Sequence, residues 1–491
     1  MAETDSLGVV FPFTGQRRST TALGREVLVD ALREVDPVGA RLAAAETNWR
    51  TGYPAHFRRL VVAGLDSGQA ARTIATHGLA SIGERLSWAA LGGVETSLAD
   101  AIAARPGPAP AAPARQLVTE TVRGDGIPEH VVTIPYRGTR LEGGALLRQL
   151  EDWTTRGIIE PSCAAAVAEV AAHPEWLDLS DVHLVVLGAG AEMGPLRAAL
   201  RWGADVYAVD LARPQLWRGL LEDSKRYAGW LHLPARPGSG RLEERAGVDL
   251  VTEWPAVRQW LDGIDGRLVL GNYVYADGAD NVRVAAAVDA LTAAVCTQRP
   301  DTALAFLATP TDAFAVPRSV VSRSVAAYDG AKLSRALRGP MRAVSGGRLL
   351  TRNYLPTADP GINDSVVPQQ GPNYLLAKRI QRWRAAVERD RGRTVSFTVA
   401  PPTRTRSVVK NRALAAAYAG AHRFGIEVFE PATANTLLAV LLVHDLRTGP
   451  RSSGQVWVDE AAHAAHGGLW TTAYEPRSAL GLAALLGFAA R

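Results

Sequence analysis

Two tyrosines, each followed four residues later by a lysine, are the residues whose type and spacing most clearly suggest chemistry. They are Tyr328 with Lys332 and Tyr374 with Lys378. The chain has only four lysines beside fifty arginines and eleven tyrosines, so chance placement predicts about 0.1 such pairs. A nearby ammonium lowers the pKa of a phenol, and residues four apart share one helix face. Each pair therefore indicates acid–base chemistry, and the alternative is that both lysines are ordinary helix-surface residues.

A glycine-rich turn lies where a phosphate could bind. Gly188, Gly190 and Gly194 follow an apolar run and precede a helix-like stretch. Glycines let the backbone approach a pyrophosphate, and a helix N-terminus offers it unpaired N–H groups. Asp210 closes the next apolar run, where a carboxylate accepts hydrogen bonds from a ribose 2′-OH and repels a 2′-phosphate. The turn predicts a dinucleotide site for NAD, with NADP less expected.

Two features of this turn leave a purely structural role open. The spacing is G-x-G-x-x-x-G, one residue longer than the usual dinucleotide pattern. Glu192 also lies inside the turn, and a carboxylate there opposes phosphate binding unless it points outward or is paired. The alternative is a glycine turn that only lets a helix pack against a strand.

Short apolar runs alternate with helical patterns from about residue 181 onward, which predicts a parallel sheet covered by helices on both faces. The fold class expected is α/β, a doubly wound parallel sheet of Rossmann type with an additional N-terminal helical domain. We expect strands at residues 183–188, 205–210, 267–273, 303–309 and 394–402.

The composition divides the chain into three parts. Residues 1–115 read as a helical domain that ends in a Pro/Ala-rich linker at 104–115. Residues 116–178 alternate as strands do and then return to helical spacing, so they form an α/β lead-in segment. The remaining residues, 179–491, form the main α/β domain, with an insertion at about 319–370.

The order of these elements resembles the short-chain dehydrogenase/reductase family across about residues 179–446. In that family a glycine turn, an acid after the second strand, an Asn after the fourth, a Ser or Thr after the fifth and a Tyr-x-x-x-Lys pair follow in this order. The catalytic residues that the resemblance implies are Tyr374, Lys378, Thr309, Thr311 and Asn272. The cofactor-binding residues that it implies are Gly188, Gly190, Gly194, Asp210, Asp249, Asn272, Lys378, Pro401 and Thr403.

The resemblance also assigns roles within these two sets. Asp249 is expected to follow the third strand and contact adenine, and Pro401 with Thr403 to follow the sixth. Tyr374 is preferred over Tyr328 because a helix-like stretch and a strand-like run ending at Pro401 follow it, whereas the helix after Tyr328 breaks early. Tyr328 stays the alternative.

The expected function is NAD-dependent interconversion of an alcohol and a ketone on a small molecule. Tyr374 would exchange a proton with the substrate oxygen, with Lys378 lowering its pKa. The insertion and the C-terminal segment would supply the pocket walls. Two alternatives stay open: a redox-neutral lyase or isomerase on the same scaffold, and a non-catalytic dinucleotide-binding protein.

Charge and composition exclude several other classes. The net charge is only +5 and the arginines are spread among acids, so no nucleic-acid partner is expected. A basic segment at residues 401–412 could contact a cofactor phosphate or form a solvated loop. The first twenty residues lack a signal pattern and no apolar run is long enough to span a membrane, which favours a cytoplasmic protein without a membrane partner. A homo-oligomer through the helix bearing Tyr374 is possible unless the N-terminal domain covers it.

Metal binding is not expected. The two cysteines are too few for a zinc site or a disulfide framework. His463 and His466, with Asp459 and Glu460 nearby, fit a solvated polar helix face better than a ligand set.

Overall fold

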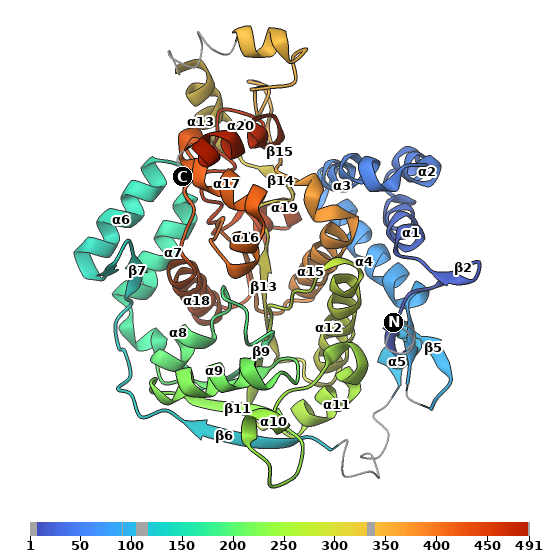
Figure 1. The fold of residues 1–491 in the computed structure, drawn as a ribbon, viewed down its shortest axis with the longest axis vertical. Coiled ribbons are helices and arrows are strands. Elements are labelled where there is room, and N and C mark those ends of the chain that lie inside the picture. The colour runs from blue at the N-terminus through green and yellow to red at the C-terminus, as the bar shows by residue number, and fades with distance from the viewer. Residues whose placement is uncertain (1–6, 91, 105–115, 331–338, 490–491) are drawn as a thin grey trace.

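A seven-stranded sheet organises the chain in the computed structural model, which describes residues 7–90, 92–104, 116–330 and 339–489 (Figure 1). The strand order is β16-β13-β12-β9-β10-β11-β6, and every neighbouring pair is parallel except β11 with β6. The strands are β6 (Val118–Arg123), β9 (Val182–Leu187), β10 (Asp205–Val209), β11 (Trp230–Ala235), β12 (Arg267–Asn272), β13 (Ala303–Ala308) and β16 (Val395–Val399). The prediction of a mixed α/β chain with a mostly parallel sheet is confirmed.

Helices cover both faces of this sheet, which explains why its strands are almost continuously apolar. Val185 and Val186 are neighbours in β9, yet they belong to two different hydrophobic cores because alternate residues of a strand face opposite sides. The helices that connect or cover the strands are α8 (Leu196–Arg201), α9 (Pro214–Lys225), α11 (Leu250–Asp262), α12 (Gly278–Gln298), α15 (Gly371–Asp390) and α18 (Pro431–Thr448).

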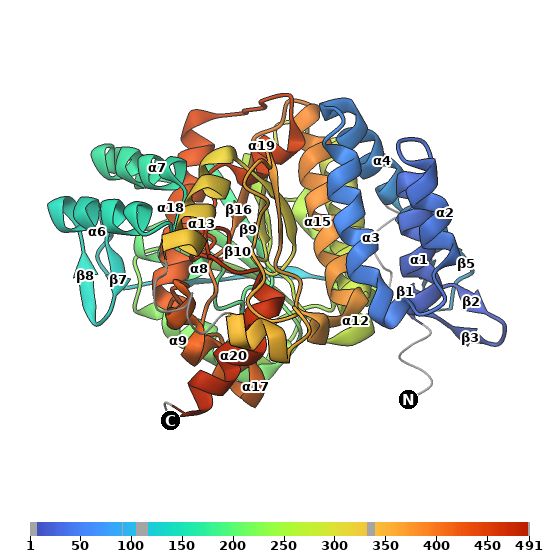
Figure 2. The same cartoon turned by 90° about the horizontal axis from the view of Figure 1, so that it is seen from above.

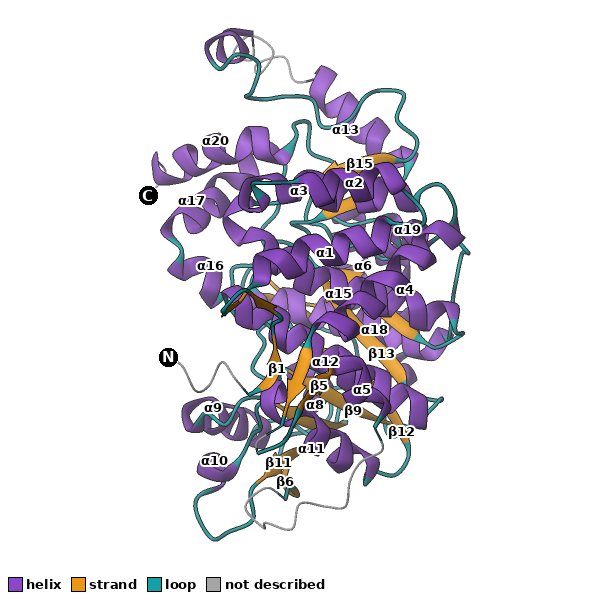
Figure 3. Cartoon of the chain, turned by 90° about the vertical axis from the view of Figure 1, so that its right-hand side faces the viewer, coloured by secondary structure: helices purple, strands orange, loops and turns teal. Residues whose placement is uncertain are grey.

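The N-terminal helices share the core of the sheet instead of forming a separate one. They are α1 (Thr20–Leu32), α2 (Pro37–Ala45), α3 (Trp49–Gly64), α4 (Gly68–Arg85) and α5 (Leu98–Ala103). Leu23 and Phe57 belong to the same buried cluster as Ile380 of α15. Gly78 of α4 lies so close to Trp383 of α15 that a Cβ on it would come within 2.4 Å of the indole ring. Figures 2 and 3 show α3 and α4 packed against α15, with α1 and α2 on their outer side.

This packing bears on the predicted oligomer. Because α4 lies on α15, the helix bearing Tyr374 does not offer that face to a second chain.

The N-terminal segment also contains a feature that its helical pattern did not predict, a three-stranded sheet of β1 (Gly8–Val10), β4 (Ser87–Ala89) and β5 (Glu95–Ser97).

Residues 116–178 are joined to the main sheet. Their first strand, β6, pairs antiparallel with β11 and forms one edge of the seven strands. The predicted strand at Ile134 and the helix after it are present as β7 (Ile134–Tyr136), hairpin-paired with β8 (Thr139–Leu141), and α6 (Gly143–Thr155). Helix α7 (Pro161–Ala172) follows and shares a buried core with α18.

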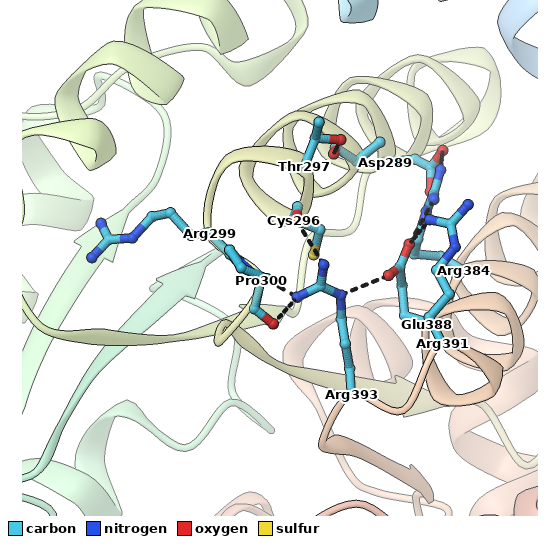
Figure 4. A network of polar contacts seen from close by, with 10 residues as sticks. Asp289, Cys296, Thr297, Arg299, Pro300, Arg384, Glu388, Arg391 and Arg393 are labelled. Carbon is cyan, nitrogen blue, oxygen red and sulfur yellow. Dashed lines mark hydrogen bonds and ion pairs between the residues drawn. The ribbon is translucent and has the colours of Figure 1, made fainter.

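Buried ion pairs fix α15 in place (Figure 4). Arg384 donates to both carboxylate oxygens of Asp289 on α12, at 2.7 and 2.9 Å, and to Glu388 at 3.1 Å. Arg393 donates to Glu388 at 2.8 Å and to the carbonyl oxygen of Cys296 at 2.6 Å. Removing one partner of such a pair leaves an uncompensated buried charge, so the network holds α15 firmly against α12.

Across the described ranges, none of the helices combines the length and apolar character that crossing a membrane requires.

The insertion contributes α13 (Arg318–Gly330) and β15 (Gly361–Asp364), which pairs with β14 (Ala313–Val316).

Candidate active site

Tyr374 and the two predicted threonines meet at the carboxyl end of β13. Tyr374 lies in the first turn of α15, and Thr309 and Thr311 directly follow β13 with their hydroxyl oxygens 2.8 Å apart. Burial raises the pKa of the Tyr374 phenol, the Asp312 carboxylate raises it further, and contacts with the Thr309 and Thr311 hydroxyls oppose the shift. The structure thus brings together a phenol and two hydroxyls from segments about 65 residues apart in the sequence, a separation that loop closure tolerates.

Lys378 and Asn272 are connected through a residue that the sequence interpretation missed. The ammonium Nζ of Lys378 donates to Oε1 of Gln381 at 3.3 Å, and Nε2 of Gln381 donates to Oδ1 of Asn272 at 3.4 Å. Asn272 ends β12, and its Oδ1 also accepts from the backbone N–H of Val274. Gln381 comes three residues after Lys378 on one helix face, a spacing that could have identified it.

The expected effect of Lys378 on Tyr374 is wrong for this structure. Burial lowers the pKa of Lys378 to about 8, with Asp312 opposing the shift. The pKa of Tyr374 is raised and not lowered, so the phenol keeps its proton at neutral pH. Tyr374 therefore suits the donation of a proton better than its removal from a substrate.

The alternative tyrosine lies elsewhere. Tyr328 on α13 is in a small separate cluster, where its ring meets Tyr474 edge to face at 5.6 Å and Arg352 stacks over it at 4.3 Å. Its partner Lys332 lies outside the described residues. Among the two candidates, only Tyr374 meets the threonines after β13.

The glycine turn is held by the acid that was predicted to bind ribose. Gly188 has a φ of +87°, and a Cβ on it would come within 2.9 Å of the Tyr273 backbone, so only glycine fits. The carboxylate of Asp210 accepts from the backbone N–H of Gly190 at 2.8 Å and from that of Leu211 at 2.7 Å. Burial raises the pKa of Asp210, and these two hydrogen bonds oppose the shift. Asp210 thus fixes the shape of the turn.

Glu192 is paired and not directed at a phosphate position. Its Oε2 accepts from the backbone N–H of Arg406 at 2.8 Å, and its Oε1 lies 3.4 Å from the Arg406 guanidinium. The basic segment after β16 therefore reaches the glycine turn and neutralises its acid. Gly194 differs from Gly188, because a Cβ on it would meet nothing closer than 3.5 Å.

Three other predicted cofactor residues serve local contacts. Asp249 lies between the third strand, β11, and α11. It caps α11, where its Oδ1 accepts from the Val251 N–H at 2.9 Å. Thr403 is buried and donates to the carbonyl oxygen of Pro401 at 2.8 Å.

The segment after β12 joins the glycine turn to Tyr374. Tyr273 lies against Gly188 and approaches the Cβ position of Gly194 to 3.6 Å. Two residues later, the ring of Tyr275 meets that of Tyr374 edge to face, with centroids 6.2 Å apart. The predicted cofactor turn and the predicted catalytic tyrosine therefore lie on two sides of one short segment.

An apolar cavity reaches Thr311. It encloses about 700 Å³ of empty space, including the solvent at its mouth. Tyr418 in its wall is close enough to Tyr374 for the two phenols to affect each other, and burial with this neighbour raises the pKa of Tyr418. The walls include residues of the insertion and of the C-terminal segment, among them Ser365, Val366, Val367, Pro402, Leu414, Ala417, Tyr418, Phe424, Leu469, Leu480 and Ala483.

The two histidines singled out in the sequence point to different partners. His466 is fully buried, stacks on Trp470 and lies 3.0 Å from Glu160, whereas His463 approaches Asp445. The expectation of one solvated polar face over residues 459–466 is therefore wrong. Glu460 pairs with Arg382, and Asp459 accepts from the Ser453 N–H at 2.8 Å.

No protein-family model matches this sequence, and a search of curated proteins yields no match either.

Proposed function

We propose that this protein is an NAD-dependent oxidoreductase that interconverts a ketone and an alcohol on a small apolar molecule. The observation that carries the proposal is the meeting of Tyr374 with Thr309 and Thr311 beside an apolar cavity. A phenol and a hydroxyl at the mouth of such a cavity can hold and protonate a carbonyl oxygen.

The sheet order supports a dinucleotide site at the same edge. Read from β11 through β10, β9, β12 and β13 to β16, it matches the 3-2-1-4-5-6 order of doubly wound dinucleotide-binding folds. In such sheets ligands bind outside the carboxyl ends of the strands, where the order reverses. Here that point lies between β9 and β12. The turn at Gly188 follows β9, and Asn272 is the last residue of β12. This strand order supports the Rossmann-type architecture that the resemblance to short-chain dehydrogenases implies.

The glycines of the turn would suit a cofactor pyrophosphate, and the Asp210 carboxylate would suit the ribose. Gly188 and Gly190 have no side chains of their own, and the nearby acid Glu192 is paired with Arg406. Asp210 directly follows β10 and accepts one hydrogen bond on each oxygen, so lone pairs remain that could accept from a ribose hydroxyl, while its charge would repel a 2′-phosphate. NAD, when bound, would accept or supply the hydride.

The residues of this chain would move the proton. Tyr374 holds its proton at neutral pH, so it would donate it to the ketone oxygen, which Thr311 would orient. Lys378, Gln381 and Asn272 form a line of hydrogen-bonded groups that would hold the Lys378 ammonium one helical turn from Tyr374.

One observation keeps a redox-neutral function open. The Asp210 carboxylate already holds two backbone N–H groups, so the turn has a stable shape without a ribose. A lyase or isomerase with the same tyrosine, or a dinucleotide-binding protein without catalysis, would retain this arrangement.

Calorimetric titration with NAD⁺, NADH, NADP⁺ and NADPH separates these functions. The unmodified protein should bind NADH more tightly than NADPH. The Asp210→Asn variant loses the negative charge and keeps an acceptor, so its affinities for NADH and NADPH should be closer to each other. NADH oxidation is then followed with a panel of apolar ketones. Oxidation that Tyr374→Phe abolishes supports the oxidoreductase, whereas NADH binding without turnover favours the binding protein. Binding of no dinucleotide would overturn the proposal.

A further inference from the structure

Three side chains with metal-binding atoms converge far from the candidate active site. His444 and Asp445 are neighbours near the end of α18, and His463 follows α19 (Val456–Ala461). Nδ1 of His444 and Nδ1 of His463 each lie 3.4 Å from Oδ1 of Asp445, and one ligand atom from each residue lies within 4.8 Å of the others. Asp445 contacts Ser396 in the first half of β16, whereas the candidate active site lies beyond the carboxyl ends of the strands.

The surroundings of His444 direct one ring nitrogen at the cluster. Its Nε2 lies 3.2 Å from the Glu169 carboxylate, and its Nδ1 lies 3.4 Å from Oδ1 of Asp445. When Nε2 donates to Glu169, the neutral ring has its lone pair on Nδ1, and a neutral imidazole nitrogen is a common metal ligand.

Two of the distances match those between ligands of one metal ion. A separation of 3.4 Å is long for an N–H···O hydrogen bond, whose usual range is about 2.7–3.2 Å. A tetrahedral Zn²⁺ with bonds of about 2.0–2.1 Å places its ligand atoms about 3.3–3.4 Å apart. The distances from Oδ1 of Asp445 to Nδ1 of His444 and to Nδ1 of His463 therefore equal the separation expected between two ligand atoms of one tetrahedral zinc ion.

The residues around the three side chains orient them as the outer partners of a metal site do. Glu169 holds the distal nitrogen of His444, and Ser396 donates to Oδ2 of Asp445 at 2.7 Å, which leaves Oδ1 for an ion. His463 adopts a φ of +56° and its N–H donates to the Ser162 hydroxyl at 3.0 Å. His444 has a side chain only 2% exposed, so little water competes for its Nδ1.

We propose that His444, Asp445 and His463 bind a divalent transition-metal ion, with Zn²⁺ as the ion that this donor set suits. Two imidazole nitrogens and one carboxylate oxygen are ligands that Zn²⁺ accepts, and a water molecule would complete four-fold coordination. The ion would join α18, the loop after α19 and, through Glu169 and Ser396, α7 and β16. Its role is structural, and it does not depend on the proposed function.

The test uses the full chain without a histidine tag, stripped with EDTA and then titrated with Zn²⁺ and, as a visible probe, Co²⁺. The expected result is one ion per chain, a Co²⁺ spectrum of tetrahedral type and a thermal midpoint that rises with Zn²⁺. Asp445→Asn and His463→Asn should each lose at least tenfold in affinity, and asparagine at position 463 tolerates the left-handed backbone.

The matched control is His173→Gln. His173 lies beside Glu175 at 2.9 Å on an exposed surface, and among the described residues this pair belongs to no group of three metal-binding side chains. This variant should bind Zn²⁺ as the unmodified protein does. If the unmodified protein binds no Zn²⁺, a proton holds the cluster and the proposal is wrong. Equal binding by the unmodified protein, Asp445→Asn and His463→Asn would likewise overturn it.

Discussion

The side-chain amide of Gln381 donates to Oδ1 of Asn272 across 3.4 Å, and this contact joins the helix bearing Tyr374 to the end of β12. Gln381 also accepts from Lys378, so an ammonium, an amide and a second amide form one line. The line starts one helical turn beyond Tyr374 and ends beside the segment that packs on the glycine turn. Together with the ring contact between Tyr275 and Tyr374, it connects the two halves of the candidate site.

Replacing Tyr374 with phenylalanine should abolish ketone reduction while leaving NADH binding intact. The variant loses only the hydroxyl that would donate the proton, and general acid catalysis of this kind contributes about 10²- to 10⁴-fold to rate. The measurement is NADH oxidation with the best ketone of the panel. Tyr328→Phe is the matched control, because Tyr328 lies in a separate cluster, and it should leave the rate unchanged. The reverse pattern would transfer the assignment to Tyr328.

Lys378→Met should stabilise the protein at neutral pH. Burial lowers the pKa of Lys378 to about 8, below its ordinary value near 10.4, so folding is opposed while the side chain is charged. Between about pH 8 and 10.4 the unfolded chain binds more protons than the folded chain, and the stability of the unmodified protein rises with pH. The gain in the variant should therefore be largest below pH 8, up to about 3 kcal/mol, and shrink toward pH 10.4.

Urea unfolding at pH 7 and pH 10 measures this difference. Lys225→Met at the exposed end of α9 is the control, and it should change the free energy of unfolding by less than about 0.5 kcal/mol at both pH values. A Lys378→Met variant that is less stable than the unmodified protein at pH 7 would mean that the ammonium has a partner that outweighs its burial.

The sequence predicts the parts of this fold that depend on local pattern. The five strands expected after residue 181 are present, because each is a short apolar run with a turn or a helix after it. The third strand was missed: β11 contains His232 and Pro234, whereas the more apolar run at residues 248–251 begins a helix. Pairing partners such as β6 with β11 are separated by more than 100 residues, and no local pattern records them.

For the candidate site too, the sequence predicts where residues lie along the sheet but not which partners their side chains contact. The meeting of Tyr374 with Thr309 follows from their order along the chain, since both occupy the carboxyl edge of the sheet. The hydrogen-bond partners do not follow, because each polar side chain takes the nearest donor that packing supplies. Asp210 therefore holds Gly190, and Lys378 meets Gln381.

Gly188→Ala should damage the glycine turn and Gly194→Ala should not. The Gly188→Ala variant would have to keep a φ of +87°, which is unfavourable for a residue with a side chain, and its Cβ would lie 2.9 Å from the Tyr273 backbone. This strain costs about 1–3 kcal/mol. Gly194 has room for a Cβ, so its variant should stay within about 0.5 kcal/mol of the unmodified protein. Chemical denaturation gives both values, and NADH affinity should fall only in Gly188→Ala. Equal losses in the two variants would show that the turn differs from this geometry.

Arg384→Ala should destabilise the chain far more than Arg391→Ala, although both arginines pair with Glu388 (Figure 4). The side chain of Arg384 is 10% exposed and its loss leaves the buried Asp289 without its bidentate partner, so we expect a cost of about 3–5 kcal/mol. The side chain of Arg391 is 62% exposed, and Glu388 keeps Arg384 and Arg393 without it, so the cost should stay below about 1 kcal/mol. Urea unfolding midpoints give both values.

The double variant Asp289→Leu with Arg384→Met removes both charges and should recover much of the loss, because the penalty of Arg384→Ala comes mainly from the carboxylate left behind. A double variant as unstable as Arg384→Ala would instead assign the loss to packing between α12 and α15.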